Sequence, residues 1–235
     1  MISWLITELS EHYTLVKTLK DSPTSLVQLL RHNTLSTNLI KRTYTGSAEV
    51  YRLLRGVCHK TLPTVYEVTA EDSTVLVLEE YIDGTTIAEG LQGRTYTEEE
   101  ARRVMLALCD ALSVLHSLGV IHRDIKPENV MMDKGGTVKL IDFNAAKFYK
   151  AYKANDTMVI GTTGFAAPEQ FGIAQSDERT DIFSLGILLN VMLTGEHPSR
   201  KQYQGKHFSR IIERCTQIAP NKRYPDAQSL AKELR

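Results

Sequence analysis

Alternating apolar and polar residues in the early part of the chain predict a small antiparallel sheet. A β-strand points successive side chains to opposite faces, so this alternation is typical of strands with one buried face. Residues 20–25 hold aspartate, proline and serines, which predicts a turn between the first two strands. The predicted strands cover residues 14–19, 26–30, 37–42, 63–68 and 73–81.

Helical spacing replaces this alternation after the third strand and again through most of the remaining chain. A short helix is predicted over residues 48–57, where apolar residues recur at helical steps. A long helix is expected after Thr97, which forms a capping-box pattern with Glu100, and Gly119 ends it. Another apolar helix is expected at 182–193. The pattern favours an α+β chain whose sheet precedes a mainly helical part.

Composition narrows the possible partners and location. The 235 residues are 42% hydrophobic, which allows one substantial core, and 28 basic residues balance 28 acidic ones. Because the formal net charge is zero, no overall electrostatic attraction to a nucleic acid or a membrane is expected, and neither is expected as a partner. The three cysteines lack metal-ligand spacing, and the apolar N-terminal run lacks the basic leader of a signal peptide. We therefore expect a reduced, cytoplasmic protein.

The candidate chemistry lies in two short motifs. Residues 122–129 read His-Arg-Asp-Ile-Lys-Pro-Glu-Asn, and residues 142–144 read Asp-Phe-Asn. Two short strands around a Gly-Gly turn are expected between the motifs. Asp124, Asn129 and Asp142 offer the hard oxygen ligands that Mg²⁺ prefers. Together they could grip a metal-bound nucleotide and an attacking hydroxyl.

Residues 122–129 resemble the catalytic loop of protein kinases, in which the Asp acts as base and the Asn binds metal. Further anchors follow in family order: Ala-Pro-Glu at 167–169, Asp181, and Arg223 as the partner of Glu169. Residues 13–235 thus resemble a eukaryotic-type (Hanks-type) serine/threonine protein kinase catalytic domain of a minimal bacterial kind. The resemblance implies a bilobal fold, with a five-stranded antiparallel sheet lobe at 1–83, a mainly helical lobe at 84–235, and ATP between them.

The resemblance also implies roles for the loop residues. Asp124 would accept the proton of the substrate hydroxyl, and Lys126 would neutralise the γ-phosphate. Asn129 and Asp142 would hold Mg²⁺, with Mn²⁺ as an alternative. Thr162 would bond to the catalytic aspartate and lysine.

For the nucleotide, the resemblance assigns Lys41 to the α/β-phosphates, paired with Glu49 on the following helix. Read alone, Lys41 is better explained as a solvated strand-end lysine, and Glu49 can equally be a surface charge in a first helical turn. The backbone carbonyl of Glu80 and N–H of Ile82 would bond the adenine edge. The remaining residues that the resemblance assigns to the nucleotide site are Leu19, Val27, Met131 and Asp142.

Several residues depart from the family pattern. Lys20, Ser22 and Ser25 stand where glycines normally cover the phosphates. The other departures are Leu39 for an alanine expected near adenine, a polar Glu79 at the gatekeeper position, and Asn144 for a glycine. Two functions therefore stay open: an ATP-dependent protein serine/threonine kinase, or a pseudokinase that binds nucleotide or acts as a scaffold. A small-molecule kinase is disfavoured by the Ala-Pro-Glu segment and Lys126.

Arg123 beside the catalytic aspartate is typical of kinases whose activation segment is ordered by phosphorylation. Among the hydroxyls between Asp142 and Glu169, Thr157 is the predicted autophosphorylation site, and the alternative is an ordinary loop threonine. The expected partners are protein substrates with Ser/Thr acceptors and a transient dimer for autophosphorylation.

Overall fold

The structure, a computed structural model, describes residues 2–149, 162, 164–171 and 175–235. The chain divides into two compact units, Met1–Asp83 and Gly84–Arg235. Among the helices in these described ranges, none has both the length and the apolar character needed to cross a bilayer.

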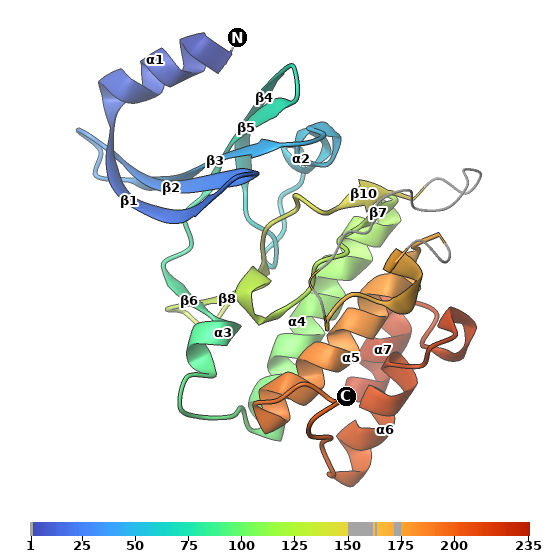
Figure 1. The fold of residues 1–235 in the computed structure, drawn as a ribbon. Helices are drawn as coiled ribbons and strands as arrows, with labels where there is room; N and C mark the ends of the chain where they lie inside the picture. Colours follow the sequence, from blue (N-terminus) through green and yellow to red (C-terminus); the bar gives the residue numbers. More distant parts are fainter. Residues whose placement is uncertain (1, 150–161, 163, 172–174) are drawn as a thin grey trace. The chain divides into compact units, whose positions relative to one another are not determined.

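The first unit contains the predicted five-stranded antiparallel sheet, in the order β1-β2-β3-β5-β4 (Figure 1). The predicted α+β class is consistent with this sheet. The strands are β1 (Tyr13–Ser22), β2 (Ser25–His32), β3 (Asn38–Thr45), β4 (Val65–Glu71) and β5 (Thr74–Glu80).

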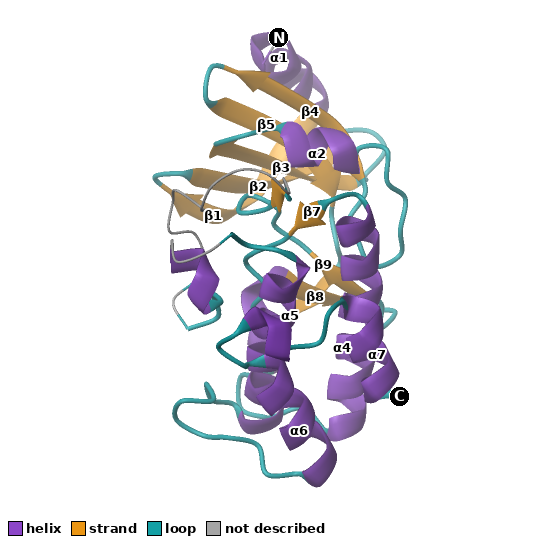
Figure 2. Cartoon of the chain, turned by 90° about the vertical axis from the view of Figure 1, so that its right-hand side faces the viewer, coloured by secondary structure: helices purple, strands orange, loops and turns teal. Residues whose placement is uncertain are grey.

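Helices cover both faces of this sheet (Figure 2). α1 (Ile2–His12), which the sequence pattern did not predict, places Leu9 in a buried cluster with Leu30, Leu39, Leu76 and Leu78. α2 (Glu49–Leu54) is shorter than predicted and covers the opposite face, where the rings of Tyr51 and Tyr44 have centroids 5.7 Å apart. Each face of β3 is therefore packed against a different helix.

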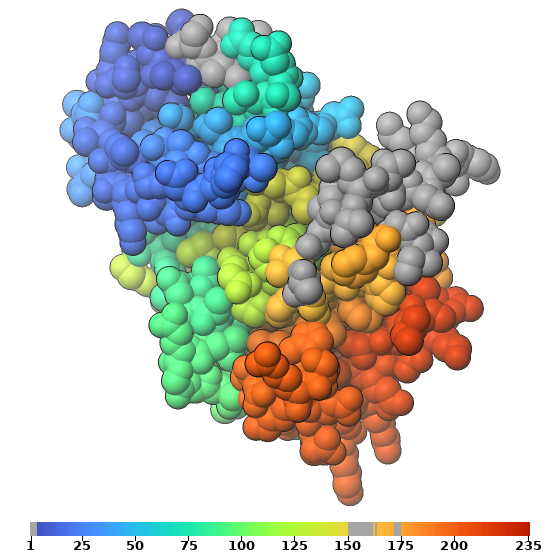
Figure 3. Space-filling view, viewed as in Figure 1, coloured from blue at the N-terminus to red at the C-terminus, as the bar shows by residue number. Residues whose placement is uncertain are grey.

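The β1–β2 hairpin is tighter than the sequence suggested. Ser22 pairs directly with Ser25, so most of the expected turn at 20–25 is strand, and Pro23 and Thr24 make the turn. The Ser22 hydroxyl donates to the carbonyl of Ser25 at 2.9 Å and accepts from its N–H at 3.1 Å. Almost every residue of β1 is exposed, and the hairpin forms a broad surface of the first unit (blue in Figure 3).

The second unit is mainly helical, as expected. The capping box of Thr97 and Glu100 is confirmed at the start of α4 (Glu98–Ser117), and Gly119 follows the helix with φ of 72°. α5 (Glu178–Thr194) is buried along most of its length and begins earlier than predicted, at a capping box from Asp177 to Thr180. The remaining elements are β6 (Gly84–Thr86), α3 (Ile87–Gly90), β7 (Val120–Ile121), η1 (Pro127–Asn129), β8 (Val130–Asp133), β9 (Val138–Leu140), β10 (Lys147–Phe148), η2 (Pro168–Phe171), α6 (Lys206–Cys215), η3 (Pro220–Lys222) and α7 (Ala227–Leu234).

Candidate active site

The buried residue Asp181 of α5 anchors the backbone of the catalytic loop. Its buried carboxylate accepts the backbone N–H groups of His122 at 2.9 Å and Arg123 at 2.8 Å. Arg123 has φ of 70°, a left-handed conformation that is costly for a residue with a side chain. The two bonds to Asp181 offset that cost and fix the direction in which the chain enters Asp124.

Asp124 is the centre of a hydrogen-bond network that contains every predicted loop residue. Its Oδ1 accepts the Thr162 hydroxyl at 2.7 Å, and its Oδ2 lies 2.7 Å from Lys126 Nζ and 2.9 Å from Asn129 Nδ2. Lys126 Nζ also donates to Thr162 Oγ1 at 2.5 Å. The structure thus brings Asp124, Lys126, Asn129 and Thr162 together, although Thr162 lies far along the sequence.

The environment of Asp124 keeps its carboxylate charged. Burial acts to raise the Asp124 pKa, but the hydrogen bonds from Lys126 and Thr162 outweigh it, so the pKa lies below its ordinary value. An ionised carboxylate with about 15% of its side chain exposed can accept a proton from an incoming hydroxyl.

His122 is a structural residue here. It packs edge-on against Phe143 with ring centroids 5.2 Å apart, and its Nε2 lies 3.2 Å from the carbonyl of Ile141. Burial lowers the pKa of His122, more strongly than the neighbouring carboxylates raise it. The ring therefore stays neutral and supports the loop from inside the unit.

Asn129 and Asp142 have the chemistry of a Mg²⁺ site. Asn129 Nδ2 donates to the carbonyl and carboxylate of Asp124, at 2.8 and 2.9 Å, which leaves the amide oxygen for a cation. The chain returns from β9 to place Ile141 N–H 2.9 Å from the Asn129 carbonyl, so the next residue, Asp142, starts beside the loop. Hard oxygen donors on two segments joined by this backbone bond have the ligand chemistry of Mg²⁺.

Asn144 does not strain the Asp-Phe-Asn turn. The left-handed residue is Asp142, with φ of 65°, whereas Asn144 keeps negative φ and its N–H lies 3.4 Å from Asp142 Oδ1. The glycine that the family has at this position is therefore not needed for backbone conformation in this chain.

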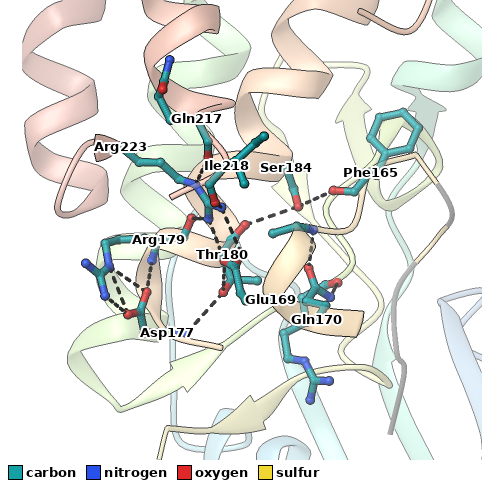
Figure 4. Close-up of polar contacts among 12 residues, drawn as sticks. Phe165, Glu169, Gln170, Asp177, Arg179, Thr180, Ser184, Gln217, Ile218 and Arg223 are labelled. Carbon is teal, nitrogen blue, oxygen red and sulfur yellow. Dashed lines mark hydrogen bonds and ion pairs between the residues drawn. The ribbon is translucent and has the colours of Figure 1, made fainter. Parts of the chain in front are cut away.

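The predicted pairing of Glu169 with Arg223 is confirmed (Figure 4). The two side chains form a bidentate ion pair, with N···O distances of 2.6 and 2.9 Å, and the Thr180 hydroxyl donates to Glu169 at 2.9 Å. Arg223 also donates to the carbonyls of Arg179, Gln217 and Ile218. Buried charges with this many partners rigidify the segment that follows Thr162.

Gln170 is a buried residue that sequence reasoning missed. Its Nε2 donates to the carbonyl of Arg123 at 2.9 Å, while its Oε1 accepts the N–H of Ala167 at 2.9 Å. The side chain therefore ties the Ala-Pro-Glu segment to the catalytic loop. The available signal was a polar residue immediately after the predicted ion-pair residue Glu169.

In the first unit, the structure separates residues that were expected to meet. Lys41 lies opposite Gln28 and Leu78, whereas Val27 lies opposite Arg42, so Lys41 and Val27 are on different faces of the sheet. α2 packs on the Arg42 face. Glu49, at the start of α2, is exposed. The predicted pair of Lys41 and Glu49 is therefore wrong, because strand register turns Lys41 away from α2.

Comparison with known proteins identifies the fold. A family model described as "Protein kinase domain" matches residues 30–235. The chain belongs to the protein kinase family. This kinase domain is 30% identical to "Sperm motility kinase Z" of Mus musculus over 97% of the chain and 46% of that relative. It is 31% identical to "Serine/threonine-protein kinase D" of Synechocystis sp. over 85% of the chain and 43% of the relative.

A third relative is "Probable serine/threonine-protein kinase PknB" of Lactococcus lactis, 30% identical over 69% of the chain and 27% of the relative. These matches confirm the expected Hanks-type serine/threonine class. The chain spans less than half the length of each of these three relatives.

The other residues assigned to the nucleotide are divided between the units of the kinase domain. Leu19 sits at an irregularity of the β1–β2 pairing and is exposed, while Ile82 is buried. Glu80 donates its N–H to the Thr64 carbonyl at 2.8 Å and lies opposite Leu39 of β3. Met131 lies half-buried on β8 of the second unit, and Thr157 falls outside the described residues.

Proposed function

We propose that this kinase domain transfers the γ-phosphate of ATP to serine or threonine hydroxyls of protein substrates. The observation that carries the proposal is the closed network of Asp124, Lys126 and Thr162, together with Asn129. It joins a charged base, a cation and a metal-binding amide within hydrogen-bond distance. Phosphoryl transfer depends mainly on such positioning and on charge neutralisation.

The geometry supports the following roles in this reaction. Asp124 orients the substrate hydroxyl and receives its proton as the oxygen attacks the γ-phosphorus. Lys126 offsets the charge on the transferred group, and Thr162 keeps the aspartate and the lysine at a fixed distance. Asn129 and Asp142 would hold Mg²⁺, or Mn²⁺, which when bound neutralises the phosphate oxygens.

Regulation by autophosphorylation of Thr157 is part of the proposal. The Arg123 side chain is buried, and its Nε has no hydrogen-bond partner within the described part of the chain. The pKa of Lys147 is lowered mainly by burial and also by the positive charge of Arg123, so the two cations are close to each other. A phosphate would relieve this repulsion. We expect one copy of the chain to phosphorylate another in a transient dimer. Mass spectrometry after incubation of the chain with Mg-ATP should find phosphate on Thr157.

The test of catalysis is phosphate transfer by the full chain from radiolabelled Mg-ATP to a generic acceptor protein, followed by phosphoamino-acid analysis. We expect phosphoserine and phosphothreonine, with loss of label when EDTA removes the metal or when Asp124 is changed to Asn. Asp72→Asn is a matched control, because Asp72 is an exposed turn residue with φ of 53°, which asparagine also accepts.

Equal incorporation by the unsubstituted chain and Asp124→Asn would defeat the enzymatic proposal. Nucleotide binding without any metal-dependent transfer would instead identify a pseudokinase. The tight β1–β2 turn favours this alternative, because it lacks the glycines that cover the ATP phosphates in the family.

A further inference from the structure

Arg42 and Glu79 form a buried ion pair inside the sheet of the first unit. Nε and Nη2 of Arg42 lie 3.0 and 2.9 Å from Glu79 Oε1, and both side chains are about 5% exposed. Removing two charges from water costs several kcal/mol per ion, so such a pair is weak evidence for stability alone. A buried arginine among strands therefore calls for a functional explanation.

Strand register places this pair on the face that carries Val27. Arg42 lies opposite Val27 on β2 and Val77 on β5, and Glu79 lies opposite Ile40 on β3. Directly opposed residues share a face, as do residues two apart on one strand. Val27, Ile40, Arg42 and Glu79 consequently form one surface, which is the surface that α2 also covers.

The other face of the sheet packs against α1. Leu39, which was expected to crowd the adenine, packs instead in the cluster of Leu9, Leu30, Leu76 and Leu78 beneath α1. Lys41 shares that face, and burial lowers the pKa of its amine. Lys41 therefore shares its face with the leucines beneath α1, whereas Arg42 shares its face with Val27, the residue assigned to adenine.

We propose that Arg42, not Lys41, is the cation of the sheet that contacts the nucleotide phosphates, and that Glu79 of β5 orients it in place of a helix glutamate. This inference rests on the proposed use of ATP. A guanidinium presents its N–H donors in a rigid fork whose geometry suits phosphate oxygens. Glu79 thereby gains a role as a positioning residue.

The test uses an acyl phosphate of ATP, which transfers its acyl group to a lysine amine that touches the phosphates and releases ATP. The full chain and its Arg42→Lys variant are incubated with this reagent, with and without excess ATP, and the acylated peptides are identified by mass spectrometry. Arg31→Lys is the matched control, because Arg31 is an exposed residue of the same sheet.

We expect ATP-competed labelling of Lys126 in every protein, and additional labelling at position 42 in Arg42→Lys but not at position 31 in the control. Labelling of Lys41, or labelling of Lys126 without labelling at position 42 in Arg42→Lys, would overturn the inference while leaving the proposed function intact. Absence of any ATP-competed label, including at Lys126, would count against the proposed function itself.

A kinetic comparison guards against misfolding of a single variant. The double change Arg42→Met/Glu79→Met removes both charges, and replacing both partners of a buried pair by apolar residues is often tolerated. We expect its kcat/KM for ATP to fall at least about tenfold further than that of Lys41→Met, since charge-assisted contacts to phosphate are among the strong ones. Equal losses in the two proteins, both folded by circular dichroism, would contradict the assignment.

Discussion

The catalytic loop and the sheet of the first unit differ in how well their functional residues meet. Around the catalytic loop, Lys126, Asn129 and Thr162 each lie within hydrogen-bond distance of Asp124. In the sheet, Lys41 and Glu49 do not meet, and an unpredicted Arg42–Glu79 pair lies on the face of Val27. The residues proposed for the chemical step are therefore brought together, while Lys41 and Glu49, expected at the nucleotide phosphates, are not.

The difference has a physical origin. Loop residues close in sequence are tied to one buried anchor, Asp181, and their spacing limits where they can lie. A strand has a side-chain period of two, so a change of one residue moves a charge to the opposite face. One adjacent basic residue can thus replace another in a sheet with little change in the sequence pattern.

The largest expected effect is on the support of the loop. Glu169→Ala leaves Arg223 buried without its carboxylate, which should lower the free energy of unfolding by about 3–5 kcal/mol. Urea denaturation followed by circular dichroism measures it. Glu99→Ala, which breaks the exposed pair with Arg102, should cost less than about 1 kcal/mol. Similar losses in the two variants would mean that the buried pair does not support the loop.

Next comes the cation of the loop. Lys126→Met should lower kcat about 10²-fold or more, because a positioned charge that stabilises the transition state is removed. Steady-state transfer at saturating Mg-ATP measures it, with the exposed Lys222→Met as control. A kcat within a few fold of that of the unsubstituted chain would mean that Lys126 does not neutralise the transferred phosphate.

Thr162 should have a smaller effect, because it acts through its two neighbours. Thr162→Val removes one hydroxyl that bonds to a charged pair, worth about 1.5–3 kcal/mol, or about ten- to hundredfold in kcat. Thr162→Ser keeps the hydroxyl and should retain most of the rate. If serine fails to rescue, the methyl group and not the hydrogen bond determines the effect.

The smallest effect concerns pH. The folded pKa of His122 lies below its ordinary value of 6.5, so the unfolded chain takes up the proton first and stability is lost as the pH falls through about 6.5. Replacement by Phe should remove up to about 1.4 kcal/mol of the fall in unfolding free energy between pH 7.5 and 5.5. The exposed His207→Phe should leave that fall unchanged. An unaltered pH dependence in His122→Phe would mean that folding does not shift the pKa of the ring.

Much of the fold and the loop could be predicted from the sequence. The five strands, the Thr97 cap and the Glu169–Arg223 pair depend on local patterns or on motifs with fixed spacing. The covering of Leu39 by α1 depends on which strand face a helix occupies, and no local pattern encodes this. Gln170 was missed for a related reason, since its partner Arg123 lies far away in the sequence.

The central claim is that the loop performs the transfer while other residues hold the nucleotide. The direct measurement is the Kd for Mg-ATP and the single-turnover transfer rate of Asp124→Asn, each beside the unsubstituted chain. We predict a Kd within about threefold and a rate lower by about 10² to 10⁴, the usual contribution of a positioned base. A rate that is unchanged, or a Kd that rises as steeply as the rate falls, would contradict the claim.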